Sequence, residues 1–118
     1  MLYTCSTSAV NKKAAKMKSY CIAPGQGNDA VAPDKYDLSL HKRGVMTDKG
    51  FALNYEMKLR SREAYEWMQR VAGESTHEDV VLVGEDEAAD KSCRIMLAEI
   101  MTSMFSGKMN FRYLGELK

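Results

Sequence analysis

Proline and cysteine are scarce in this chain of 118 residues, which has two prolines and three cysteines. The cysteines are widely spaced and odd in number, and they form no CxxC pair or cysteine–histidine ladder. These spacings support neither a disulfide framework nor a zinc site. We expect Cys5, Cys21 and Cys93 to be free, mostly buried thiols in a reducing compartment, with no bound metal ion and no cofactor.

Long apolar runs are absent as well. The longest is far shorter than the roughly 20 residues that a membrane-spanning helix needs, so the sequence predicts no insertion into a membrane. After residues 1–5 the chain turns polar and lysine-rich, and it lacks the basic start and apolar centre of a secretory signal. We therefore expect a cytoplasmic protein, unless the chain has already been processed.

The composition that remains is typical of a globular domain, with 45% hydrophobic and 28% charged residues and a net charge of +1. The length suits one domain with its own core, so we expect a single domain over residues 1–118. The segment Pro24-Gly25-Gln26-Gly27 and the residues that follow it have turn chemistry. They predict a long, flexible surface loop at 24–35.

Residues 79–105 are the stretch that can bury the most apolar surface. The run Val80-Val81-Leu82-Val83 ends at Gly84 and predicts a buried strand. After an acidic step at 85–87, apolar residues recur at helical spacing and predict a helix that covers this strand. The residues of that stripe are Cys93, Leu97, Ile100, Met101 and Met104.

Other patterns predict the remaining elements. Residues 2–5 favour a strand, and residues 10–21 favour a basic amphipathic helix whose end, at 20–22, also fits a strand. Alternation of apolar and polar residues at 36–40, and strictly at 51–60, predicts an antiparallel hairpin. Residues 61–72 fit a helix that Ser61 caps and Gly73 ends, and residues 109–117 fit a final strand.

Strands that are interleaved with helices in this way are typical of an α+β protein. We expect a two-layer sandwich, in which a mixed, mainly antiparallel sheet carries two to three helices on one face. The order of elements from residue 51 onwards also allows a right-handed crossover connection.

Surplus apolar surface on the last helix predicts a protein partner. The chain has nine methionines, and the apolar face of this helix is wider than one stripe, so a second subunit or another protein would have to cover part of it. We expect a small, non-catalytic interaction or regulatory protein that binds a protein partner or forms a homodimer. Its size and lack of motifs also fit an accessory protein of a phage or mobile element. The predicted anchors are Trp67, Met96, Met104 and Phe105.

An alternative function is the binding of nucleic acid or of a small phosphorylated ligand. Basic residues gather on the predicted first helix and on the predicted hairpin, and two glycines would let backbone amides approach a phosphate. The candidate residues are Lys12, Lys13, Lys16, Gly25, Gly27, His41, Lys42 and Arg43.

An enzymatic function has the least support in the sequence. The acidic residues Glu85, Asp86, Glu87 and Asp90 could hold Mg²⁺, but carboxylates in a first helical turn also oppose the helix dipole, which is the simpler interpretation. His77 lies beside Glu78 on a predicted loop, without the serine and aspartate order of a nucleophilic site.

Overall fold

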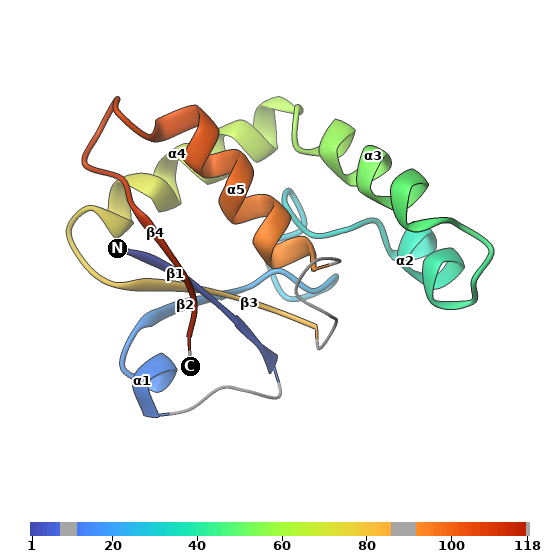
Figure 1. Cartoon of the computed structure of the whole chain (residues 1–118), viewed down its shortest axis with the longest axis horizontal. Helices are drawn as coiled ribbons and strands as arrows, with labels where there is room; N and C mark the ends of the chain where they lie inside the picture. Colours follow the sequence, from blue (N-terminus) through green and yellow to red (C-terminus); the bar gives the residue numbers. More distant parts are fainter. Residues whose placement is uncertain (8–11, 86–91, 118) are drawn as a thin grey trace.

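The fold is built around a four-stranded sheet in which all neighbouring strands are parallel (Figure 1). The structure is a computed structural model that describes residues 1–7, 12–85 and 92–117. The strand order is β2-β3-β1-β4, which places β3 and β1 in the centre. The strands are β1 (Leu2–Ser6), β2 (Lys18–Cys21), β3 (Val80–Gly84) and β4 (Tyr113–Glu116).

Five helices accompany the sheet in the described part of the chain, and the fold is α+β. The helices are α1 (Lys12–Ala15), α2 (Lys35–Lys42), α3 (Asp48–Lys58), α4 (Arg62–Ser75) and α5 (Cys93–Phe105). In Figure 1, α4 and α5 cover one face of the sheet, α1 lies on the opposite side, and α2 and α3 extend past the sheet. Among the helices of the described residues, none combines the length and the apolar character that crossing a bilayer requires.

The central strand β3 is buried on both faces. Val80 and Leu82 belong to the main core beneath α4 and α5, whereas Val81 and Val83 pack on the other face with Cys5 and Ala14. Because both faces are covered, the strand is an unbroken apolar run rather than an alternating one. Helices α4 and α5 contribute Ala64, Trp67, Met68, Val71, Ala72, Leu97, Ala98, Met101 and Phe105 to the main core.

The prediction of a mainly antiparallel sheet is wrong, because its hairpin does not form. Residues 36–40 and 51–60 lie in or directly beside α2 and α3 instead of forming two strands. Asp34 Oδ1 accepts hydrogen bonds from the backbone N–H groups of Tyr36 and Asp37, at 2.9 and 3.0 Å, and so begins α2. Thr47 Oγ1 accepts from the N–H of Gly50 at 3.0 Å and begins α3 in the same way. These N-caps satisfy donors that a helix start leaves without an acceptor.

The absence of the predicted hairpin is consistent with a parallel sheet. A tight turn joins only antiparallel strands, whereas parallel strands need a crossover, which is commonly helical. At least one helix now lies between every two consecutive strands. The predicted strands at 2–5 and 80–83 and the predicted helices at 61–72 and in 93–105 are confirmed. Of the predicted helix at 10–21, residues 10 and 11 lie outside the described residues, α1 covers residues 12–15, and β2 takes the end that also fitted a strand.

The connection between β2 and α2 packs against the core. Ile22, Val31 and Ala32 are buried, and the hydroxyl of Tyr55 donates to the carbonyl oxygen of Val31 at 2.5 Å. Trp67 Nε1 donates to a side-chain oxygen of the same connection, Asn28 Oδ1, at 3.1 Å. Several residues of the segment predicted as a surface loop are thus held by buried contacts and by hydrogen bonds from α3 and α4. The single domain and the flexibility at 24–35 stay predictions.

Candidate functional site

A pocket lies at the carboxyl edge of the sheet, where β2 and β3 end and α5 begins. In open sheets of parallel strands, ligands bind at this edge. The cavity volume is about 20 Å³, which is enough for a water-sized group. The pocket is lined by Ile22, Ala23, Pro24, Pro33, Leu38, Gly84, Glu85, Ser92, Cys93 and Arg94.

Ser92 provides the pocket wall with a polar group that is not satisfied within the described residues. The residue is 2% exposed and holds the N-cap position of α5. Its side chain makes no capping hydrogen bond, and Oγ has no hydrogen-bond partner in residues 1–7, 12–85 and 92–117. Leaving a buried hydroxyl unsatisfied costs roughly 1–3 kcal/mol, so a group that bonds to it would recover this energy.

Arg94 supplies a buried positive charge to the same wall. The residue is 3% exposed, and its Nε donates to both carboxylate oxygens of Glu116, at 3.2 and 3.1 Å. Nη2 donates to Glu116 Oε1 at 2.6 Å, and Nη1 donates to the carbonyl oxygen of Glu85 at 2.9 Å. A guanidinium has five N–H donors, so these bonds leave one donor on each Nη without an acceptor in the described residues.

Glu116 holds this guanidinium in place as a carboxylate. Burial alone would raise the pKa of Glu116, but the hydrogen bonds from Arg94 and Thr4 outweigh burial and lower it. The carboxyl group therefore stays ionised at neutral pH, and its charge balances that of Arg94. At the pocket rim, Lys42 Nζ pairs in the same way with Glu85 Oε2 at 2.6 Å.

Gly84 allows the start of α5 to approach the end of β3. A Cβ atom at this position would lie 3.2 Å from Cβ of Arg94, closer than ordinary van der Waals contact. The absence of a side chain therefore brings the N-terminus of α5 close to the strand end. The first N–H groups of a helix carry partial positive charge, which favours a negatively charged group in front of them.

Cys93 is the first residue of α5, and its half-buried side chain lines the pocket. Cys5 is buried in the core cluster on the α1 side of the sheet, and Cys21 is half-buried on β2. None of the three cysteines forms a disulfide. Cys93 is the only one of the three cysteines that lines the pocket, so its chemical modification can report whether the pocket is occupied.

The four predicted partner-binding residues lie in different environments. Trp67 and Phe105 are buried in the main core, where Trp67 also makes the hydrogen bond to Asn28. Met96 and Met104 are half-buried on α5, and Met104 lines a groove of about 370 Å³ with Tyr65. The partner that these residues were predicted to bind stays a prediction.

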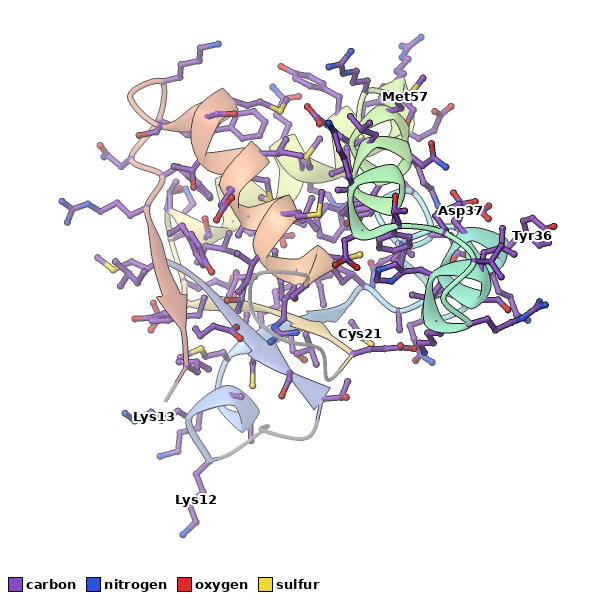
Figure 2. All side chains as sticks on the ribbon, turned by 45° about the vertical axis from the view of Figure 1, so that its right-hand side comes forward. Lys12, Lys13, Cys21, Tyr36, Asp37 and Met57 are labelled. Atoms are coloured by element: carbon purple, nitrogen blue, oxygen red, sulfur yellow. The ribbon has the colours of Figure 1, made fainter. Side chains whose placement is uncertain are left out.

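The predicted basic cluster is divided between separate parts of the molecule. Lys12, Lys13 and Lys16 are exposed at α1, and Figure 2 shows Lys12 and Lys13 pointing away from the body of the protein. The basic segment His41-Lys42-Arg43 is at the end of α2, which lies in another part of the fold (Figure 1). Nε2 of His41 lies 2.6 Å from Asp48 Oδ1, and Lys42 pairs with Glu85. Among the described residues, the two basic groups therefore belong to different elements of the fold, α1 and α2.

The remaining predicted residues are spread over several places and do not form one group. Gly25 and Gly27 are exposed in the connection that follows β2, both with positive φ, next to Pro24 of the pocket wall. Of the acidic step, Glu85 lines the pocket, while Asp86, Glu87 and Asp90 lie outside the described residues. His77 is exposed after α4. Within the described ranges, no group of three or more His, Cys, Asp or Glu residues is placed to hold a metal ion.

Sequence reasoning did not find Ser92, Arg94 and Glu116, although two of them had a usable signal. Ser92 stands directly before the helical stripe, where N-caps occur. The face of α5 that is buried contains Arg94, Leu97, Ala98, Met101 and Phe105, which differs from the predicted stripe. An arginine at helical spacing from buried apolar residues indicates a buried charge, but its partner Glu116 has no local sequence signal.

The comparisons with known proteins give no assignment. No protein-family model matches the chain, and no curated protein or solved structure matches it significantly.

Proposed function

We propose that this protein binds a small ligand through an anionic end group, a carboxylate or a phosphate, in the pocket at the carboxyl edge of the sheet. The unsatisfied Ser92 Oγ, buried at the start of α5, is the observation that carries the proposal. The remaining donors of Arg94 and the partial positive charge of the helix start favour the same kind of ligand.

The pocket size restricts which part of the ligand is bound. A cavity of about 20 Å³ admits a few atoms, so only the end group enters and the remainder of the ligand stays outside. The charges of the wall are already paired, Arg94 with Glu116 and Lys42 with Glu85. The site therefore favours a singly charged group that accepts hydrogen bonds over a highly charged one, whose burial would cost more.

Replacing Ser92 with alanine tests the ligand site. We expect Ser92→Ala to weaken the binding of acetate or inorganic phosphate by at least about 10-fold, because hydrogen bonds to charged groups contribute roughly 1.5–3 kcal/mol. Titration calorimetry with each anion separately shows whether the site takes the carboxylate or the phosphate. The bound anion should also slow the alkylation of Cys93, measured by mass spectrometry.

The matched control is Ser106→Ala. Ser106 is the exposed C-cap residue of the same helix and lies at its other end. Its replacement should leave anion binding unchanged. The proposal is wrong if neither anion binds saturably, or if Ser92→Ala binds as tightly as the original protein.

The same substitution has an expected effect on stability in the absence of ligand. Replacing an N-cap serine by alanine commonly costs about 1 kcal/mol, because a capping hydrogen bond is lost. Ser92 makes no such bond, and its hydroxyl is buried without a partner in the described residues. We therefore expect Ser92→Ala to raise the free energy of unfolding by about 1 kcal/mol in urea denaturation. A loss of the usual size would mean that Ser92 is an ordinary cap.

A further inference from the structure

Helix α3 carries apolar side chains on two opposite faces. Phe51, Tyr55 and Leu59, at i, i+4 and i+8, are buried against the rest of the protein. Leu53 and Met57 are one turn apart on the other side of the helix, where they are 51% and 67% exposed. An exposed apolar residue by itself needs no explanation, but two on one helical stripe form a contact surface.

Charged residues on the same stripe give this surface a particular pattern. Glu56 lies on α3, and Arg60 follows the C-cap residue of the helix, four residues after Glu56. We call Leu53, Glu56, Met57 and Arg60 the outer face of α3. Both charged side chains are largely exposed, and Arg60 Nη2 lies 3.7 Å from Glu56 Oε1. Figure 2 shows Met57 towards the C-terminal end of α3, and its 67% exposure leaves it accessible to a second molecule.

We propose that two copies of this chain associate through the outer face of α3, with the two helices antiparallel. A twofold axis close to Met57 sets Glu56 of each copy opposite Arg60 of the other. A pair of opposite charges one turn apart on one helix therefore matches the same pair on an antiparallel second copy. A twofold interface requires such a self-complementary surface. The two Met57 side chains meet near the axis and are removed from water.

The flanks of the outer face extend the contact. In the antiparallel arrangement, Leu53 of each copy lies towards the start of the other copy's α4, where Tyr65 is exposed. Glu56, Arg60 and Tyr65 also line the groove of about 370 Å³ that reaches α5. One helix and part of a groove make an interface below the roughly 800 Å² per partner of stable complexes. We therefore expect reversible association in the micromolar range.

Charge reversal on α3 tests this interface. In Glu56→Arg, two arginines of one copy face two arginines of the other, and in Arg60→Glu the same holds for glutamates. Each single variant should weaken self-association at least about 10-fold in analytical ultracentrifugation, because opposed like charges are unfavourable. The double variant E56R/R60E restores opposite charges across the axis and should associate as the original protein does.

Mixing the two single variants gives the sharpest result. The Glu56→Arg chain offers two positive charges and the Arg60→Glu chain two negative ones, so the mixture should form a heterodimer although neither variant associates alone. This outcome requires residues 56 and 60 to face each other across two copies. A shared loss of folding cannot produce it, and circular dichroism of each variant checks the fold independently.

The matched control is an exposed charge on a helix far from α3. Lys12 is exposed on α1, which lies on the opposite side of the sheet from α4 and α5 (Figure 1). Charge reversal by Lys12→Glu should leave self-association unchanged. A protein that is monomeric throughout the micromolar range overturns the proposal. So does a dimer that is indifferent to charge reversal at residues 56 and 60.

Discussion

Replacing Glu116 with alanine is expected to lower the free energy of unfolding by about 3 kcal/mol. The substitution leaves the guanidinium of Arg94 buried without its counter-charge, and removal of one partner from a buried ion pair costs roughly 3–5 kcal/mol. We expect a value at the lower end, because the Glu116 side chain is 29% exposed and water can enter the place it leaves. Urea denaturation at neutral pH measures the effect.

The reverse substitution should cost less. Arg94→Met leaves a carboxylate that is partly exposed to water, so we expect a loss of about 2 kcal/mol. In the double variant, Glu116→Ala should add little to Arg94→Met, because neither charge is then left alone. Equal losses from the two single variants, or fully additive losses in the double variant, would contradict an ion pair whose buried member is the arginine.

The effect of Glu116→Ala should also depend on pH. The pKa of Glu116 in the folded protein lies below the ordinary value of a glutamate, so the carboxylate contributes its full stabilisation at pH values above that ordinary pKa. This stabilisation is lost as the pH falls through the folded-state pKa, where the carboxyl group of the original protein takes up its proton. The difference between the original protein and Glu116→Ala should therefore narrow in acid and stay constant around neutral pH.

Truncation of Leu82 is expected to destabilise the protein by about 3 kcal/mol. This side chain is fully buried on the central strand β3, between the sheet and the helices that cover it. Leu82→Ala removes its contacts and leaves a cavity, and such replacements in close-packed cores cost roughly 2–5 kcal/mol. The change in the midpoint of urea denaturation, at a constant dependence on urea, gives the loss.

Leu114 provides a matched control for this truncation. It is also a leucine on a strand, but it is 49% exposed on the edge strand β4. Leu114→Ala should change the free energy of unfolding by no more than about 0.5 kcal/mol. Similar losses from the two leucines would show that burial on β3 does not determine the stability of this domain.

The sequence was sufficient for the elements whose apolar spacing fits only one structure. The run at Val80–Gly84 is too short for a helix and is apolar throughout, as a strand with two covered faces should be. In α4 the buried residues recur at helical spacing after a serine cap, and Ser61 Oγ accepts from the N–H of Ala64 as expected. In β3 and α4 the local sequence pattern and the tertiary packing favour the same structure, so the pattern by itself predicts the element.

Residues 51–60 show why local pattern failed elsewhere. Their strict alternation contains Phe51, Tyr55 and Leu59, which also have the spacing of one helical face. Both structures bury these three side chains, and the difference is that the helix leaves Leu53 and Met57 exposed. The cap at Thr47 favours the helix, but it is a single residue whose role depends on its neighbours.

The candidate site was less predictable than the fold, because it joins distant parts of the chain. The sequence indicates Glu85 and the residues around Gly25 through separate patterns, and neither pattern indicates that β2 and β3 end side by side. These two strand ends are adjacent because of the strand order, and the predicted hairpin implied a different sheet. The pairing of Arg94 with Glu116 depends on β4 lying beside β1, which no local pattern encodes.

The strand order also determines when the sheet can assemble during synthesis on the ribosome. β1 and β2 are made first, but they are not neighbours, since β3 lies between them and pairs with both. Neither early strand has this partner until residues 80–84 have left the ribosome, so the nascent chain must hold two strand segments without it up to that point. Such long-range pairing slows folding, and it leaves the edges of the two early strands exposed until β3 is available to pair with them.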